Sequence, residues 1–313
     1  MGNGTKPRRG KRRARKKDWE RPLPRLNRSA LVPPEKEGFL FRFAVYGDNQ
    51  RGVLIHRRIA KNILISGAEV VLHVGDYVQD GRKDEQWDGQ FLLPAAGLLD
   101  QTLFLGVQGN HDRNSPRYYQ IVRPPGGRSW FKALRYPVAF FGLDSNRRLA
   151  EQARWLEREL AATEEPWKIV FFHEAPYASS WPWPGGALKT RKNFLPVLEA
   201  GGIDLVFTGH IHNYERFHKN GIVYLITGGG GDTLAKPEQL ENPYLVWSDK
   251  RHHFCTADVF PDRIEVLARD LAGVPFDGVV VEKGENPREV ALKKRRGYTG
   301  PRPKQFPNRL GAR

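Results

Sequence analysis

Two histidines separated by one residue, His210 and His212, stand in the segment FTGHIHNYERF at residues 207–217. They follow a short apolar run that ends in Gly209, so a tight loop after a strand could turn both imidazoles toward one ligand. Imidazole nitrogens are common ligands of transition metals. The segment therefore raises the question of whether further metal-binding side chains stand at equivalent places elsewhere in the chain.

Polar side chains also follow four other apolar runs. A lone Asp at such a place is most often a helix N-cap, and a lone His is most often a core residue. Five successive strand ends that each carry an Asp, Asn or His are not explained in this way. The carboxyl ends of strands in α/β sheets line the ligand crevice, so these side chains should meet there. The set predicts a metal site made by Asp48, Asp76, Asn110, His173, His210 and His212, with His111 and Asp112 beside it.

The ligand types narrow the choice of metal. Carboxylate, amide oxygen and imidazole without thiolate suit Mn, Fe, Zn or Co better than a structural zinc site rich in cysteine. Six candidate ligands are too many for one open catalytic ion, so we expect two divalent or mixed-valence ions that share a carboxylate. Such a pair polarises a phosphoryl oxygen and lowers the pKa of a bound water.

Strands and helices alternate in the first half of the body, which implies parallel pairing, and strands joined by short turns dominate the second half. The apolar pattern predicts strands at 39–48, 69–76, 102–112, 138–145, 167–177, 203–212, 221–231 and 274–283, a hairpin over 254–270, and helices at 54–67, 87–100, 151–163 and 193–202. These elements predict an α/β domain over residues 38–290, with one mixed sheet or two packed sheets.

Three further features depend on local composition. Residues 178–192 are rich in Pro, Gly and Trp and are expected to form a long functional loop. His252 and His253 start a strand and are expected at the surface, whereas His73 lies inside a strand and is expected in the core. The single cysteine, Cys255, excludes an internal disulfide and favours a reducing, cytoplasmic compartment.

The net charge of +16 belongs to the two ends of the chain. Residues 6–17 contain nine basic residues, residues 293–313 contain eight, and neither segment contains an acid. Residues 1–37 and 291–313 are therefore predicted to be disordered basic tails. They could bind nucleic acid or another polyanion, or act only as solubilising extensions. No apolar run is long enough for a transmembrane segment, and the oligomeric state is left open.

The motifs GD at 47–48, GDYV at 75–78, GNHD at 109–112, His173 and GHIH at 209–212 resemble those of the calcineurin-like metallophosphoesterases. GHIHNYER and the later ITGGGG are most similar to the purple acid phosphatase branch. The resemblance implies a four-layer sandwich of two mixed β-sheets flanked by helices, with a dinuclear metal site at its edge.

The resemblance also implies a role for each side chain. Asp76 would bridge the two ions. Asp48 and His212 would hold the first ion, and the second would be held by Asn110, His173 and His210. His111 would protonate the leaving oxygen or stabilise the transition state, and Asp112 would orient His111 or shape the loop.

Two positions depart from the purple acid phosphatase pattern. Gln79 stands where that branch has an iron-binding tyrosine, and Tyr77 is expected to point away, so no purple colour is expected. Gln50 stands where other branches have a histidine. Its amide oxygen could bind the first ion or leave that position to water, so this ion should be held weakly.

The expected activity is hydrolysis of a phosphoester, a monoester first, by metal-bound hydroxide assisted by His111. The alternatives are a phosphodiesterase or nuclease that acts on nucleic acid held by the tails, or a metal-containing binding protein with weak catalysis. Lys189 and Arg191 could contact substrate phosphate or be solvated charges, and Trp183 could stack on the leaving group or pin its loop.

Overall fold

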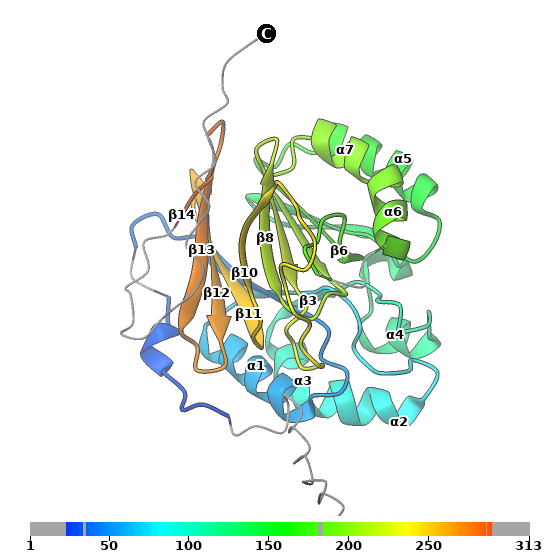
Figure 1. Cartoon of the computed structure of the whole chain (residues 1–313), viewed down its shortest axis with the longest axis vertical. Helices are drawn as coiled ribbons and strands as arrows, with labels where there is room; N and C mark the ends of the chain where they lie inside the picture. The colour runs from blue at the N-terminus through cyan, green and yellow to red at the C-terminus, as the bar shows by residue number, and fades with distance from the viewer. Residues whose placement is uncertain (1–22, 34–35, 181–183, 286, 290–313) are drawn as a thin grey trace, which may run out of the picture.

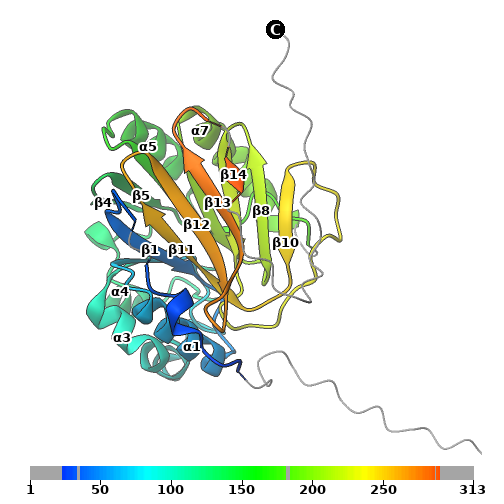
Figure 2. The ribbon, with the colours of Figure 1, turned by 90° about the vertical axis from the view of Figure 1, so that its left-hand side faces the viewer.

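Two mixed β-sheets face each other, and helices cover their outer faces (Figures 1 and 2). The computed structural model describes residues 23–33, 36–180, 184–285 and 287–289. Within these residues each sheet contains seven strands. The predicted four-layer sandwich is therefore confirmed, and of the two arrangements left open by the sequence the structure has two packed sheets.

The first sheet has the strand order β14-β13-β12-β11-β1-β2-β3. Its strands β1, β2 and β3 are parallel, and the remainder pair antiparallel. The parallel strands end at the same edge, which is the edge expected to carry ligands. The strands are β1 (Phe41–Tyr46), β2 (Val70–His73), β3 (Leu103–Gly106), β11 (His253–Val259), β12 (Arg263–Asp270), β13 (Pro275–Glu282) and β14 (Arg288–Glu289).

The second sheet has the order β10-β8-β9-β7-β6-β5-β4, with β5, β6, β7 and β9 parallel. Its parallel strands also end at one edge. The strands are β4 (Phe131–Arg135), β5 (Val138–Gly142), β6 (Trp167–Glu174), β7 (Leu205–Gly209), β8 (Tyr214–Lys219), β9 (Ile222–Thr227) and β10 (Leu245–Asp249).

The helices divide between the two outer layers. In Figure 1, α1 and α3 lie against the first sheet, and α5, α6 and α7 lie against the second. The helices are η2 (Arg28–Ala30), α1 (Val53–Ile65), α2 (Asp84–Gln86), η3 (Trp87–Leu92), α3 (Leu93–Gln101), α4 (Pro116–Ile121), η4 (Pro125–Gly127), α5 (Leu149–Ala161), α6 (Pro184–Asn193) and α7 (Leu195–Ala200).

The alternation of side chains along β1 explains why both of its faces are apolar. Phe41, Phe43 and Val45 belong to the core between the sheets. Ala44 and Tyr46 belong to a second core beneath the helices. Because successive strand residues point to opposite faces, a strand buried on both sides is mostly apolar, and the one charged residue of β1, Arg42, is buried in a pair with Asp258. The continuous apolar runs of the sequence follow from this burial.

Pro94 does not end the helix that surrounds it. It lies in the first turn of α3, directly after the π-helical segment η3. Proline has no N–H for the carbonyl of Gln90 four residues earlier. That carbonyl instead accepts from His56 Nδ1 at 2.9 Å and Asn49 Nδ2 at 3.4 Å. These two hydrogen bonds of the Gln90 carbonyl therefore connect the helical segment to α1 and to the loop that follows β1.

Three local expectations are corrected by the structure. The packed body begins before residue 38, because Leu31 is buried and its carbonyl accepts from Arg42 Nη1 at 2.6 Å. Residues 184–193 form helix α6 within the expected long loop. His252 and His253 are buried rather than exposed, since glycines at 228–231 let a neighbouring loop pack over them. His73 is buried as expected.

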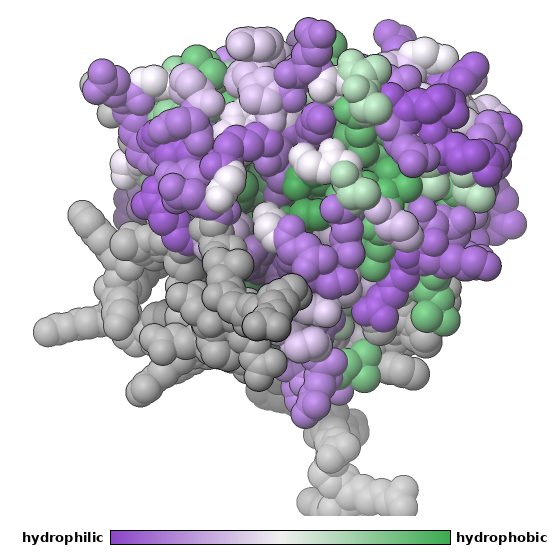
Figure 3. Space-filling model, turned by 90° about the horizontal axis from the view of Figure 1, so that it is seen from above, coloured by the Kyte–Doolittle hydropathy of each residue, from purple (hydrophilic) through white to green (hydrophobic). Residues whose placement is uncertain are grey.

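Exposed apolar side chains are scattered over the described surface. The face in Figure 3 is mostly hydrophilic, with hydrophobic residues in narrow bands among the coloured atoms. Single exposed residues such as Leu54, Leu93 and Leu134 lie on different elements. Scattered exposure of this kind is ordinary. Among the described helices, none has the length and apolar character needed to cross a membrane.

Candidate metal centre

The carboxyl ends of the parallel strands in both sheets bring the predicted side chains to one place. Asp48 follows β1, and Asp76 follows β2. His173 lies near the end of β6, and His210 directly follows β7. Three of them, Asp48, Asp76 and His210, have positive φ angles of 58°, 56° and 67°. Such angles are uncommon outside glycine and are typical of functional sites, where the surrounding structure holds them in place.

The distances show that the six predicted ligands converge. Candidate ligand atoms of Asp48, Asp76 and His173 all lie within 4.8 Å of one another. The Oδ1 of Asn110 lies 3.0 Å from both His173 Nε2 and His210 Nδ1. His212 Nε2 lies 3.5 Å from Asp48 Oδ1. Residues from five separate strand ends thus share one cluster, in which Asp48, Asp76 and His173 are buried and the other three are partly exposed.

The two carboxylates and the imidazoles determine one another's charge. Burial by itself would lower the pKa of His173, but the carboxylate of Asp76 at 3.3 Å raises it to about 10. Burial likewise opposes the effect of Asp48 on His212, whose pKa is nevertheless raised to about 9. The pKa of Asp76 is held below its usual range by His173, against the effect of burial. Opposite charges within hydrogen-bonding reach are needed to keep such groups buried.

His210 differs from the other two histidines. Burial, followed by the nearby charge of His173, lowers its pKa to about 4. Its ring Nδ1 lies 3.2 Å from His173 Nε2. A neutral imidazole is the form that binds metals. The cluster therefore contains nitrogen, carboxylate oxygen and amide oxygen donors at one point, which is the donor set predicted from the sequence.

His111 lies beside the cluster rather than in it. Its backbone N–H donates to Asp76 Oδ1 at 2.8 Å, and its ring Nδ1 lies 2.7 Å from the carbonyl of Gln79. Because a carbonyl can only accept, Nδ1 must carry the proton in this contact. Among the described residues, none forms a hydrogen bond with Nε2 of this ring. The ring is therefore held by one nitrogen, and the other is available to a ligand.

Asp112 organises the two loops beneath the cluster. Its carboxylate accepts three backbone hydrogen bonds, from Asp76 at 3.0 Å, Tyr77 at 2.9 Å and Gly109 at 2.7 Å. Among the described residues, this carboxylate forms no hydrogen bond with the His111 ring. Of the two roles expected for Asp112, these bonds support shaping of the loop.

The two glutamines at the departures from the family pattern both lie near the cluster. Gln50 Nε2 lies 3.4 Å from Asp76 Oδ2, and Gln50 Oε1 is buried without a hydrogen-bond partner. Gln79 contacts His111. Tyr77 points away as expected, because its ring stacks on His73 at 3.9 Å in the helix-covered core. The structure thus offers no tyrosine oxygen at this position.

The residues predicted to contact substrate are less well placed. Lys189 is exposed on α6. Arg191 is tied to its own surroundings, since its Nε donates to the carbonyl of Pro176 at 2.7 Å and its guanidinium lies 5.2 Å from the ring centre of Tyr177. Trp183 lies outside the described residues. Neither described side chain is brought into the metal cluster.

The residues that the sequence did not predict hold the loop after β1 in place. The backbone N–H of Gly230 donates to the carbonyl of Gly47, and the backbone N–H of Asp232 donates to the carbonyl of Asp48 at 3.0 Å. The charge of Asp232 also contributes to the raised pKa of His212. A run of four glycines at 228–231 was the available signal, because glycine is needed where two backbones approach closely.

Comparisons with known proteins agree with this geometry. A family model described as calcineurin-like phosphoesterase matches residues 41–214, more than half of the chain. Two similar proteins of Arabidopsis thaliana are purple acid phosphatase 18, 26% identical over 56% of this chain and 46% of its own length, and probable inactive purple acid phosphatase 27, 23% identical over 69% and 43%. This chain thus spans less than half of each relative.

A solved structure shows the same fold. Purple acid phosphatase PPD1 from seeds of yellow lupin (Lupinus luteus) superposes with a TM-score of 0.67 at 18% identity, over 77% of this chain and 53% of the other. At this identity the likeness concerns the arrangement of sheets and helices alone. It agrees with the two mixed sheets described above.

Proposed function

Because the chain belongs to the calcineurin-like phosphoesterase family, we propose that it hydrolyses a phosphoester with the help of two metal ions. The convergence of six donor side chains from five strand ends carries this proposal. A phosphomonoester is the proposed substrate, which is supported by the likeness to a purple acid phosphatase. The proposed ions are drawn from Mn, Fe, Zn and Co.

The donor set fits the dinuclear site that the family implies. One carboxylate oxygen of Asp76, Oδ2, lies 3.3 Å from His173 Nε2 and 3.4 Å from Gln50 Nε2. Asn110, His173 and His210 would hold one ion, and Asp48 and His212 would hold the other. The buried, unpartnered Oε1 of Gln50 is a further oxygen donor at this point. A buried polar atom without a protein partner leaves a place for an ion or a water as its partner.

The bound ions would supply electrostatic stabilisation of the phosphoryl group and a water of lowered pKa. The chain's own residues supply the remainder. His111 is oriented by Gln79 through Nδ1–H, so Nε2 can donate a proton or a hydrogen bond to the departing oxygen when the ring is in its imidazolium form, which carries a proton on both nitrogens. Asp112 keeps the loops of Asp76 and His111 in register.

The test is a panel of aryl phosphate monoesters and diesters assayed with each divalent metal. We expect monoester turnover, with bound metal measured by elemental analysis. Asp76→Asn should lose both metal and turnover. His111→Ala should lose about 10²–10⁴-fold in turnover with unchanged metal content. A fully metallated protein that hydrolyses no phosphoester would refute the proposal, and faster hydrolysis of diesters would refute the monoester assignment.

A metal-containing protein without catalysis is the second candidate, because one similar protein is named as probably inactive. The presence of His111 beside a complete donor set favours catalysis over this reading. The same panel separates the two, since a binding protein would keep its metals and show no turnover with any ester.

Binding of nucleic acid or another polyanion remains a prediction of the sequence. Most of the two basic segments, including residues 6–17, lies outside the described residues. The prediction concerns local concentration of substrate. Deletion of the tails should therefore raise KM for polyanionic esters and spare small ones.

A further inference from the structure

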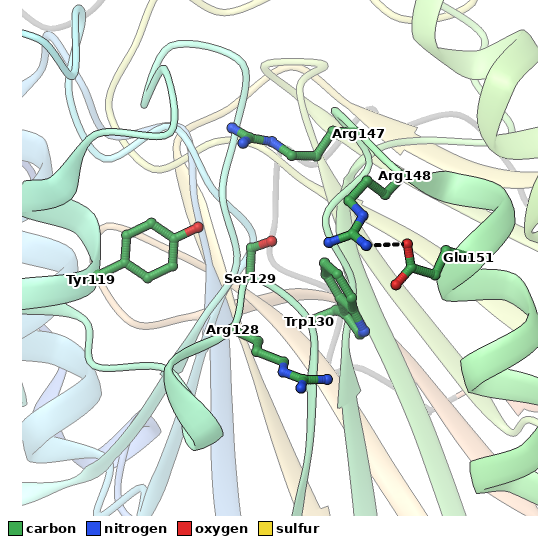
Figure 4. A pocket seen from close by; sticks show the side chains of 7 residues that line it. All are labelled: Tyr119, Arg128, Ser129, Trp130, Arg147, Arg148 and Glu151. Atoms are coloured by element: carbon green, nitrogen blue, oxygen red, sulfur yellow. Dashed lines mark ion pairs between the residues drawn. The ribbon is translucent and has the colours of Figure 1, made fainter.

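A pocket of about 340 Å³ lies between α4, the segment that leads into β4, and the start of α5 (Figure 4). It contains none of the candidate metal ligands. Three of its residues are arginines and one is an acid, so the lining is strongly basic. The lining residues are Tyr119, Arg128, Ser129, Trp130, Arg147, Arg148 and Glu151.

One of the three arginines, Arg148, forms an ion pair with the acid in the lining. Arg148 pairs with Glu151, as the dashed line in Figure 4 shows, and its guanidinium lies 5.2 Å from the ring centre of Trp130. Trp130 is itself buried. Both side chains of this ion pair are exposed, by 59% and 42%, so the pair offsets charge without fixing the position of the guanidinium. This side of the pocket therefore carries little net charge.

The other two arginines hold charge that the described residues leave largely uncompensated. Among the described residues, the Arg128 side chain forms no ion pair or hydrogen bond. Arg147 has one weak contact, with its Nε 3.5 Å from Asp144 Oδ2. Figure 4 shows Arg147 and Arg128 on opposite sides of the pocket, with the hydroxyl of Ser129 between them. Two guanidinium groups and a hydroxyl thus surround one space.

The start of α5 adds to this positive potential. Arg148 is the N-cap residue and gives no side-chain cap to the helix. The N–H groups of a first turn carry partial positive charge that favours an anion. The helix end supplements the arginines and would not constitute a site without them.

The pocket is connected to the metal centre through Gln108. The Nε2 of Gln108 donates to the hydroxyl of Tyr119 at 3.1 Å, and its carbonyl accepts from Asn146 Nδ2 at 3.2 Å. Gln108 lies two residues before Asn110, a span of at most about 7 Å of extended chain. Tyr119 in the pocket wall and Asn146, which adjoins Arg147, thus both contact the chain segment that leads into Asn110.

We propose that this pocket binds a second phosphate of the substrate, so that the preferred esters carry two phosphates. The proposal rests on the proposed function and names its substrate class. Arg128 and Arg147 provide forked donors that match phosphate oxygens, and Ser129 provides a further donor. The phosphate at the metal centre is the one that is hydrolysed.

The experiment compares adenosine 5′-monophosphate with adenosine 3′,5′-bisphosphate on the full-length, metal-loaded protein. We expect a lower KM for the bisphosphate. In the double variant Arg128→Gln/Arg147→Gln its KM should rise about tenfold for each guanidinium removed, with little change for the monophosphate. The matched control is Arg57→Gln/Arg154→Gln, which removes two exposed arginines outside the pocket and should leave both values unchanged.

Equal increases for the two nucleotides, or the same increase in the control pair, would overturn the proposal. Calorimetric dissociation constants in the His111→Ala background provide a readout that needs no turnover. If neither nucleotide is hydrolysed with any metal, nucleotide hydrolysis by the proposed site is refuted. The pocket is then judged by binding alone, where equal affinity for the two ligands, before and after the arginine substitutions, would exclude the second phosphate site.

Discussion

The chemistry at the residue scale depends on Asp76. Its carboxylate contacts His173, faces the amide of Gln50 and accepts from the backbone of His111. A buried carboxylate with this many partners is held at one position without bound metal. The free energy of its burial is offset by the charge of His173, which Asp76 itself maintains. The proposed metal centre is therefore preorganised by mutual pairing of its candidate ligands.

Gln50 is the residue expected to limit metal retention. A neutral amide oxygen is a weaker ligand than the imidazole found at this place in other branches of the family. We predict that protein purified without added metal contains fewer than two ions per molecule, and that Gln50→His raises this ratio. The measurement is elemental analysis after dialysis. Two ions that remain at full occupancy in the unchanged protein would contradict the prediction.

At the element scale, glycines at the strand ends let the loops of the two sheets meet. A Cβ at Gly209, the last residue of β7, would lie 2.3 Å from Asp48 Oδ2. A Cβ at Gly109 would lie 2.1 Å from Asp76 Oδ1. Contacts this short cannot be tolerated without movement of a carboxylate. The close approach of strand end and ligand therefore requires glycine at both positions.

We predict that Gly209→Ala displaces Asp48 and lowers metal affinity about 10–100-fold, the range typical of groups that support metal ligands. Turnover should fall together with metal content, and circular dichroism should show a retained fold. Gly89→Ala is the matched control, because a Cβ there meets no atom within 4 Å. Unchanged metal affinity in Gly209→Ala would show that the loop can relax without moving its ligand.

The whole molecule is held together by pairing of charges as well as by its apolar cores. Arg42 pairs with Asp258 between neighbouring strands, and Arg216 pairs with Asp277 across the space between the two sheets. His56 and His253 are also buried, and burial lowers the pKa of His56 to about 4 and that of His253 to about 3. Both remain neutral in the folded state, and both become protonated in the unfolded chain below about pH 6.5.

These histidines predict a loss of stability in acid. The folded pKa lies below the unfolded one, so their contribution is fully present above pH 6.5. It is lost progressively as the pH falls toward the folded value. We predict that between pH 7 and pH 5 His253→Gln loses about 2 kcal/mol less unfolding free energy than the unchanged protein. Urea titrations at both pH values measure this difference. Parallel losses in the two proteins would contradict it.

Strands made mostly of apolar residues could be predicted from the sequence, whereas a strand made mostly of polar residues could not. The strand β1 has one charged residue, Arg42, among apolar ones and was predicted. The strand β8 has the sequence YERFHK and was missed, although Glu215 and Arg216 are buried within it. Glu215 is satisfied by Ser179, Ser180 and Asn213, and Arg216 by Asp277. Apart from Asn213, these partners lie at least 35 residues away in the sequence and give no local signal.

The candidate metal ligands could also be predicted from the sequence. The order of their motifs along the chain indicated the family. Each candidate stands directly after or within an apolar run, so its place at a strand end follows from local pattern. What each side chain touches could not be read in this way. Asp112 contacts backbone groups up to 36 residues away, and the arginines of the pocket belong to no motif.

The sequence by itself determined which atoms are offered to metal, and at which ends of which strands, because both depend only on residue type and on hydrophobic periodicity. The tertiary structure decided that the two sheets pack face to face with the ends of their parallel strands side by side, that Asp112 supports the loops, and that Arg128 and Arg147 line one pocket. These outcomes depend on packing between elements far apart in the chain, and such packing is set by the combined shape and charge of all the elements together.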